Sequence, residues 1–239
     1  MDDRSEPRRS MTDHVLLEIA AFDPASALVA ARSGADRIEL CRDAAAGGLT
    51  PPLDWVREVT EATDLPVVVM VRAHADGWTF SPTEHAAMRE DARRVLDAGA
   101  AGIVWGALDR TGRIASDALR ALVETAGPSP VIVHRAVDAA RDLDEAMDAL
   151  VACGARRVLT SGGTASALAG ADRLAHLIER LGADLAVMPG GGVRASNVTE
   201  VVRRTGAREV HSGASLPGSG HVDASEVRRL RAVLDALRA

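Results

Sequence analysis

The side chains of this chain that are best suited to chemistry lie in or directly after short apolar segments. Glu39 and Cys41 belong to the segment Arg37–Cys41, His134 follows another such segment, and His211 lies in a third. A carboxylate and an imidazole can transfer protons near neutral pH, and a thiol is a soft metal ligand. The sequence therefore offers residues for acid–base catalysis and residues for metal binding.

The segment from His134 to Asp138 combines three kinds of polar side chain within one turn of chain. His134 could move a proton, Arg135 could bind an anion, and Asp138 could orient either of them. We predict Glu39 and His134 as base and acid, with Arg135 and Asp138 assisting. The alternative is that Arg135 and Asp138 form an ordinary ion pair in a loop.

Two glycine-rich segments follow predicted strands and could bind an anion such as phosphate. They are Ser161-Gly162-Gly163 and Gly190-Gly191-Gly192, and Arg72 ends another apolar segment. Backbone N–H groups in such loops can surround a phosphate or a carboxylate. Glycine also occurs wherever a loop turns tightly, so each segment alone is a weak signal.

Metal binding would depend on Cys41, with His74 and His211 as further ligands. The chain has no Cys-x-x-Cys motif and no paired-histidine motif, so the intrinsic metal signal is weak. A buried, unreactive Cys41 thiol is an equally good interpretation.

The elements that must position these residues alternate between strand and helix along the whole chain. Five helical segments end in Gly-Ala and lead into an apolar run, with the glycines at positions 34, 99, 154, 182 and 206. Glycine tolerates the left-handed conformation found at helix ends. The predicted strands are Val15–Ala20, Arg37–Cys41, Pro66–Arg72, Gly102–Gly106, Pro130–His134, Arg157–Ser161, Asp184–Pro189 and Glu209–Ser212.

Eight such units predict an α/β fold, a single-domain (βα)8 TIM barrel over residues 14–239 after a disordered tail at residues 1–13. Helix starts are predicted at Asp23-Pro24 and at capping boxes beginning with Ser81 and Asp223. A doubly wound open sheet is the competing fold.

Alternation along the strands places several charged residues inside the predicted barrel. Glu18, Arg37, Glu39 and Arg72 face the lumen in this scheme, and Arg72, His134, His211 and Cys41 fall at the carboxyl ends of their strands. Barrel enzymes keep their active sites at that end. The alternative is a plug of ion pairs that only fixes the strand register.

Composition excludes several classes of function. A net charge of −6 argues against nucleic-acid or anionic-membrane partners, and no apolar run is long enough to span a bilayer. Two cysteines suit a reducing cytoplasm, so we expect a cytoplasmic protein. The chain contains no lysine, which excludes Schiff-base aldolase chemistry.

Several ordered motifs resemble those of the CutC family of copper homeostasis proteins. They are Arg37-Ile38-Glu39-Leu40-Cys41 with Gly47-Gly48-Leu49-Thr50-Pro51, His134-Arg135-Ala136, Leu159-Thr160-Ser161-Gly162-Gly163 and Met188-Pro189-Gly190-Gly191-Gly192-Val193. The resemblance implies a cytoplasmic barrel that self-associates and binds Cu(I) through cysteine. This chain has Ala20 where the family often has a cysteine, and His74 where it usually has a second arginine.

Two functions therefore remain open at the level of sequence. One is a copper homeostasis protein with Cys41 as the main Cu(I) ligand. The other is a barrel enzyme, a lyase or isomerase, that acts on a small anionic or phosphorylated substrate. In both cases we expect a homo-oligomer, a dimer or tetramer, without a membrane or nucleic-acid partner.

Overall fold

Strands and helices alternate from one end of the chain to the other, as the computed structural model shows for residues 14–216 and 219–237. The strands are β1 Leu16–Ala21, β2 Arg37–Leu40, β3 Val67–Met70, β4 Gly102–Trp105, β5 Val131–Val133, β6 Arg157–Thr160, β7 Ala186–Pro189 and β8 Glu209–Ser212. The helices are α1 Pro24–Arg32, α2 Leu53–Ala62, α3 Pro82–Asp97, α4 Ser116–Ala126, α5 Leu143–Cys153, α6 Ala171–Leu181, α7 Val198–Thr205 and α8 Ala224–Ala236, with a 3-10 helix η1 at Arg135–Ala139. The predicted strands are confirmed to within two residues at each end.

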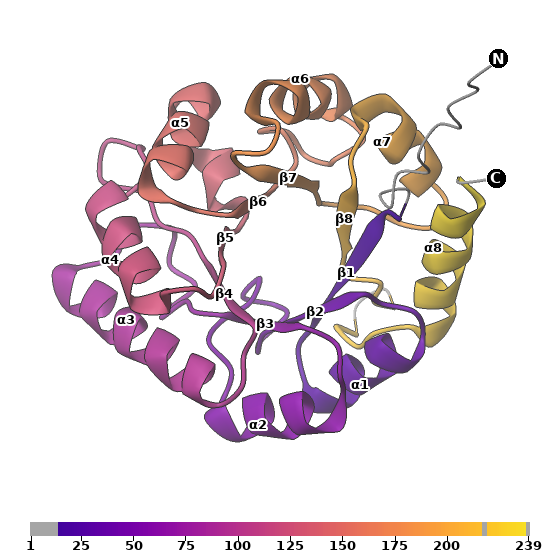
Figure 1. Cartoon of the computed structure of the whole chain (residues 1–239), viewed down its shortest axis with the longest axis horizontal. Coiled ribbons are helices and arrows are strands. Elements are labelled where there is room, and N and C mark those ends of the chain that lie inside the picture. Colours follow the sequence, from indigo (N-terminus) through magenta and orange to yellow (C-terminus); the bar gives the residue numbers. More distant parts are fainter. Residues whose placement is uncertain (1–13, 217–218, 238–239) are drawn as a thin grey trace, which may run out of the picture.

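The eight strands form one parallel sheet that curls into a nearly closed barrel inside a ring of helices (Figure 1). Neighbours in the sheet follow the order β7-β6-β5-β4-β3-β2-β1-β8, and the end strands β7 and β8 lie next to each other. This order has no reversal point, so the doubly wound alternative is wrong and the (βα)8 barrel is confirmed. The predicted tail, residues 1–13, lies outside the described residues.

The glycines that end the helices have the backbone conformation that the sequence predicts for them. The φ angles at positions 34, 99, 154, 182 and 206 are +106°, +100°, +83°, +53° and +68°. Side chains rarely tolerate these values, because the Cβ atom would clash with the backbone. Each glycine therefore stops a helix and turns the chain into the next strand.

The helix starts agree with prediction except at α8. Asp23 accepts a hydrogen bond from the Ser26 N–H, and Ser81 forms a complete capping box with Glu84. Asp223 caps α8 through the Ser225 N–H, but the expected reciprocal bond from Glu226 is absent. The Glu226 carboxylate instead accepts the Ala195 N–H, which is distant in sequence, at 2.9 Å.

The apolar core has two parts, one on each side of the sheet. The larger part lies between strands and helices and includes Leu17, Ile19, Ile38 and Leu40. A smaller apolar cluster inside the barrel comprises Cys41, Val68, Met70, Val104 and Ile132. Both sets lie on the faces that strand alternation predicts.

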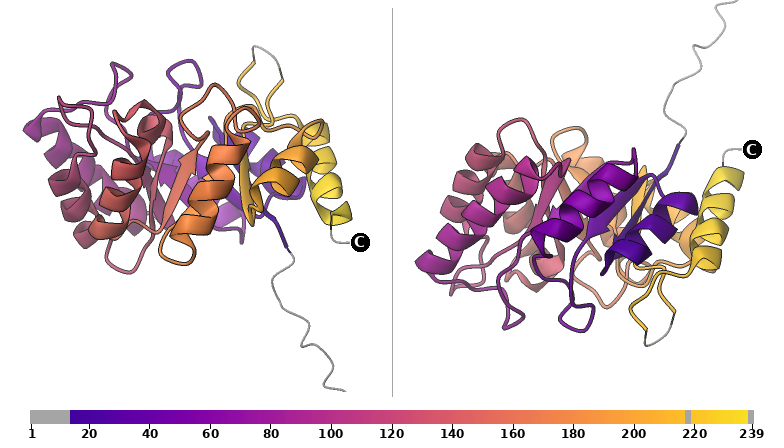
Figure 2. Two further views of the ribbon diagram at one scale, coloured as in Figure 1. Left: turned by 90° about the horizontal axis from the view of Figure 1, so that it is seen from above. Right: turned by 90° about the horizontal axis from the view of Figure 1, so that it is seen from below.

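The carboxyl ends of the strands meet at one end of the barrel, which we call the mouth. The loops after β2 and β8 rise from this end in the left view of Figure 2. No helix among the described residues combines the length and the apolar character needed to cross a membrane.

Candidate functional site at the mouth of the barrel

A row of ion pairs fills the part of the barrel interior that is farther from the mouth. The Arg157 Nε donates to Glu209 Oε2 at 2.6 Å, and an Arg37 Nη2–H donates to the same oxygen at 2.8 Å. The Arg37 Nε also donates to the Glu18 carboxylate. Parallel pairing of β1 with β2 sets Glu18 opposite Arg37, so the register of the sheet brings these charges together. Buried charges need such partners because burial removes their hydration.

The row continues upward from Glu18 to His211 and Glu39. The His211 Nδ1 lies 2.7 Å from Glu18 Oε1, and the His211 Nε2 lies 3.6 Å from Glu39 Oε2. Pairing of β1 with β8 places Glu18 opposite His211. Although Glu18 and Glu39 are both almost completely buried, only Glu18 receives hydrogen bonds from the described side chains.

The two glutamates consequently have opposite acidities. Burial raises the pKa of Glu18, but the hydrogen bond with His211 and the charge of Arg37 outweigh burial and lower it to about 2. Burial raises the pKa of Glu39 to about 7, with the His211 charge acting in the opposite direction. Burial lowers the pKa of His211, but its hydrogen bond to Glu18 and the charge of Glu39 produce a net increase.

A cavity of about 190 Å³ opens above this row at the mouth of the barrel. Its walls combine apolar, acidic and imidazole side chains from the ends of several strands. The lining residues are Ala20, Phe22, Glu39, Cys41, Gly47, Met70, Trp78, His134, Arg135, Leu159, His211 and Gly213. The structure thus brings together Glu39, His134, Arg135, Cys41 and His211 of the sequence-predicted set.

His134 presents a hydrogen-bond donor that has no partner among the described residues. Its Nδ1 accepts the Ala136 N–H at 3.1 Å, so in the neutral ring the proton lies on Nε2. The Nε2 atom is buried and unpartnered. Burial and the charge of Arg72 lower the pKa of His134 to about 3, and its ring packs 5.0 Å from the Trp78 ring. His134 is therefore a neutral donor at physiological pH.

Arg72, predicted to bind an anion, is held by the protein itself. Its guanidinium lies 4.1 Å from the Trp78 ring centroid and donates to the carbonyl oxygens of Ala46, Gly48 and Ala75 at 2.9, 3.3 and 3.1 Å. Burial lowers its pKa. These contacts show that Arg72 connects the loops after β2 and β3, and it is not among the residues that line the cavity.

The glycine-rich loop after β6 surrounds an anion, and that anion is the Asp138 carboxylate. The N–H groups of Ser161 and Gly163 donate to Asp138 at 3.1 and 3.0 Å, and the Thr160 hydroxyl also donates to it. The Arg135 Nε donates to Asp138 from the other side at 2.9 Å. The groups expected to bind a substrate anion therefore already bind a carboxylate of η1.

The remaining predicted glycines shape the loops around this carboxylate. The Gly162 N–H donates to Thr160 Oγ1 at 2.9 Å, and the Gly190 N–H donates to the Thr160 carbonyl at 3.0 Å. A Cβ atom on Gly191 would lie 3.0 Å from Arg135 Nη1, whereas one on Gly192 would have the Ser166 Cβ at 3.6 Å. Close approach of backbone and side chains thus explains the glycine at position 191.

The predicted metal residues do not meet as one set. Cys41 and His211 line the cavity, whereas His74 packs 4.6 Å from the Phe80 ring and lies 3.2 Å from Glu84 Oε1. Burial, followed by the charges of Glu39 and Glu18, raises the pKa of the Cys41 thiol. Cys153 packs as predicted, with its Sγ 3.6 Å from the Ser116 carbonyl oxygen.

Another set of potential metal ligands appears only in the folded chain. Atoms of Glu18, Glu39 and His211 lie within 4.8 Å of one another, and this is the one such trio among the described residues. Its carboxylate and imidazole donors suit borderline or hard divalent cations better than Cu(I). Alternation identified Glu18 and Glu39 as inward-facing, and His211 was predicted at the carboxyl end of its strand. Their proximity depends on the register across β8, β1 and β2.

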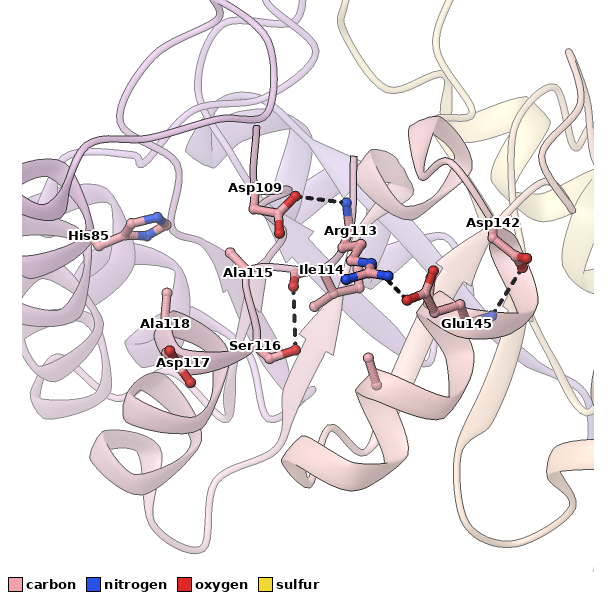
Figure 3. Close-up of a pocket in the computed structure, with 12 residues that line it drawn as sticks. His85, Asp109, Arg113, Ile114, Ala115, Ser116, Asp117, Ala118, Asp142 and Glu145 are labelled. Carbon is pink, nitrogen blue, oxygen red and sulfur yellow. Dashed lines mark hydrogen bonds and ion pairs between the residues drawn. The ribbon is translucent and has the colours of Figure 1, made fainter. Parts of the chain in front are cut away.

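A larger hollow of about 470 Å³ lies outside the barrel, between the loop before α4 and the first turn of α5 (Figure 3). Several of its polar groups are paired with one another. Arg113 pairs with Glu145 at 2.8 Å, and Asp109 accepts the Arg113 N–H at 3.0 Å. Because this hollow lies outside the barrel, away from the carboxyl ends of the strands, the mouth is the better candidate site.

Sequence reasoning overlooked Trp78 and Arg157 as parts of this arrangement. Trp78 lies in an irregular loop, where no pattern indicates that its ring will contact Arg72 and His134. Arg157 begins β6, and its pairing with Glu209 joins residues that are 52 positions apart. Alternation along β6 places Arg157 on the same inward face as Leu159, so this pattern is a signal that identifies it.

Comparison with known proteins places the chain in one family. The family model of the CutC family matches residues 15–216. CutC family proteins from Xanthomonas campestris pv. campestris (strain B100) and Caulobacter vibrioides (strain NA1000) are 40% and 41% identical over 208 and 207 residues. These alignments cover 87% of both chains for the first, and 86% of this chain and 84% of the relative for the second.

Solved structures give the same result at the level of fold. The crystal structure of the putative copper homeostasis protein CutC from Streptococcus agalactiae superposes with a TM-score of 0.79 and 26% identity, covering 83% of this chain and 98% of that chain. Thiamine phosphate pyrophosphorylase from Pyrococcus furiosus has a TM-score of 0.63 at 17% identity, covering 95% and 98%, which shows a shared barrel fold alone. The chain therefore belongs to the CutC family.

Proposed function

We propose that this CutC-family barrel is an enzyme that transfers a proton on a small molecule bound at its mouth, as an isomerase or a lyase does. The observation that carries this proposal is the Glu39 carboxylate. It is 4% exposed, lines the cavity and accepts no hydrogen bond from the described residues. A carboxylate in this position gains its natural partner when a bound substrate offers a proton.

The other cavity residues suit the same reaction. Glu39 would accept a proton from a carbon or oxygen atom of the substrate. The unpartnered Nε2–H of His134 would donate a hydrogen bond to the oxygen that becomes negatively charged. Glu18 orients His211, whose Nε2 faces Glu39 and supports its negative charge. The chain has no lysine, so the reaction proceeds without a Schiff base.

Hydrogen exchange into small carbonyl compounds in D₂O, followed by proton NMR, tests this function. The wild type is expected to exchange a carbon-bound hydrogen next to the carbonyl of a compound that binds, and Glu39→Gln is expected to lose this exchange. Glu209→Gln is the matched control, because Glu209 lies in the ionic row but does not line the cavity. Equal exchange in the wild type and Glu39→Gln would refute the assigned role.

Cu(I) binding at the mouth is the second candidate, supported by two sulfur-containing side chains in the cavity wall. A Cβ atom on Gly48 would lie 3.3 Å from both Cys41 Sγ and Met70 Cε, so the two side chains are neighbours. Thiolate and thioether are soft donors that suit Cu(I). The name of the Streptococcus agalactiae structure also supports a role in copper homeostasis.

The donor set fits Cu(I) only weakly, since one thiol is present and its pKa is raised. Anaerobic competition titration with a Cu(I) chelator tests this candidate on the wild type, Cys41→Ser and Met70→Leu. Tight binding that both variants weaken would support copper as the ligand. Weak binding that is equal in all three would refute it.

A cytoplasmic location and self-association as a dimer or tetramer remain part of this proposal. Both described cysteines, Cys41 and Cys153, are free and buried, which suits a reducing compartment. Light scattering on the purified chain measures the oligomeric state directly, and a single monomeric species would refute the self-association.

A further inference from the structure

The arginine side chains in and near the cavity wall already bind groups of the protein. Arg135 lines the cavity, but its Nε donates to Asp138 at 2.9 Å and its Nη2 donates to Ser161 Oγ at 2.9 Å. Arg72 donates to three backbone carbonyls through its Nη groups, and although its Nε has no partner, it does not line the cavity. His211 is paired with Glu18. A substrate that brings two negative charges would therefore meet no unpaired cation among the described lining residues, and it would approach the carboxylate of Glu39.

The backbone site for an anion is also filled. Asp138 occupies the loop after β6 as a bound phosphate would, with N–H groups of Ser161 and Gly163 and the hydroxyl of Thr160 directed at its oxygens. Several donors to one carboxylate hold it firmly in this position. A phosphate ester would have to displace a side chain of the protein from this loop.

The groups that remain available in the cavity wall are apolar surfaces and neutral donors, of which the His134 Nε2–H is completely buried. Phe22, Met70 and Leu159 supply apolar wall, and the His134 Nε2–H is the unpartnered donor. A buried donor without a partner costs free energy, which a ligand oxygen would recover. The cavity has a volume of only about 190 Å³. The ligand is accordingly small.

We propose that the substrate of this site is a small uncharged carbonyl compound whose oxygen accepts the His134 Nε2–H, and that it is not a phosphate ester. This inference rests on the proposed function, because it identifies the class of molecule on which Glu39 acts. It replaces the anionic substrate that the glycine-rich loops suggest when they are considered without their partners.

Matched ligand pairs test the substrate class in the intact protein. The probes are dihydroxyacetone with dihydroxyacetone phosphate, and D-ribose with ribose 5-phosphate, titrated while the ¹⁵N signal of His134 Nε2 is followed by NMR. The uncharged member of a pair is expected to bind more tightly and to shift the Nε2 signal. His134→Phe keeps a ring against Trp78 and is expected to weaken that binding about tenfold.

The outcomes separate this inference from the function on which it rests. Tighter binding of the phosphorylated member would overturn the substrate class and leave the small-molecule site intact. Failure of every probe to bind the wild type would count against both the class and the proposed function. Binding that His134→Phe does not change would overturn the role of the Nε2–H donor.

Substitution of Asp138, whose carboxylate occupies the loop after β6, gives a second test that needs no substrate. Inorganic phosphate is expected to raise the melting temperature of Asp138→Ala but not that of the wild type, because the substitution empties the loop after β6. Asp138→Asn keeps the side-chain shape and is expected to respond less than Asp138→Ala. A phosphate response of the wild type that equals that of Asp138→Ala would overturn the inference.

Discussion

Replacement of Glu39 by glutamine is expected to stabilise the protein at pH 8 and to change its stability little at pH 5. Burial raises the pKa of Glu39 from 4.5 to about 7, so the unfolded chain releases this proton at a lower pH than the folded chain. Between these pH values the folded state binds more protons, and the free energy of unfolding falls as the pH rises. Ionised Glu39 then destabilises the wild type.

The pKa difference gives the size of this effect. At ~1.4 kcal/mol per pH unit, it corresponds to about 3 kcal/mol at pH 8 and to less than about 1 kcal/mol at pH 5. Burial of the new amide offsets part of the gain, so we expect Glu39→Gln to add about 1 to 3 kcal/mol at pH 8. Urea-induced unfolding of both proteins at the two pH values measures the difference.

Glu18→Gln is the matched control, because Glu18 is equally buried but paired with Arg37 and His211. Its pKa is lowered to about 2, so the ionised form stabilises the folded state at both pH values. Its substitution is expected to cost about 3 to 5 kcal/mol at pH 5 and at pH 8. If Glu39→Gln is also destabilising at pH 8, Glu39 has a stronger partner than the His211 Nε2 at 3.6 Å, and the assignment as a carboxylate without a hydrogen bond is wrong.

Three further substitutions or titrations follow from the same contacts. Arg37→Met leaves Glu18 and Glu209 without their shared cation and is expected to lower the free energy of unfolding by about 3 to 5 kcal/mol in urea. His134 is expected to stay neutral, with its proton on Nε2, from pH 5 to pH 8, and a ¹⁵N titration that shows protonation near pH 6.5 would contradict its burial. Gly106→Ala places a Cβ atom 2.6 Å from His134 Nδ1 and is expected to cost about 1 to 3 kcal/mol, as calorimetry can measure. Gly213→Ala is its control, because the nearest atom there is 3.8 Å away, and an equal loss in both variants would refute the clash.

The sequence was sufficient to predict the fold because each of its signals is local. A glycine at a helix end, a cap at a helix start and alternation along a strand each depend on a few neighbouring residues. Eight repeats of these signals leave the parallel barrel as the arrangement that buries all the strands. The predicted reciprocal cap at Asp223 was wrong because Glu226 found a partner, the Ala195 N–H, in a distant loop.

The sequence also predicted many of the residues at the mouth. Glu39, Cys41, His134 and His211 lie at or near strand ends, which meet at one end of a barrel. What each side chain does there was decided by contacts between residues far apart in the chain. His211 meets Glu18 across 193 positions. Alternation gives the direction in which a side chain points, but the distance to its partner depends on the register and closure of the whole sheet.

The anion-binding loops show the same division between sequence and tertiary structure. The glycine-rich segment after β6 indicated that N–H groups could converge on an anion at the mouth, because its backbone is free to turn toward one. Only the folded chain decided that this anion is Asp138, carried there by η1. The same packing left His74 against Phe80 and left His134 with a free donor, because each side chain takes the nearest partner that the closed barrel offers.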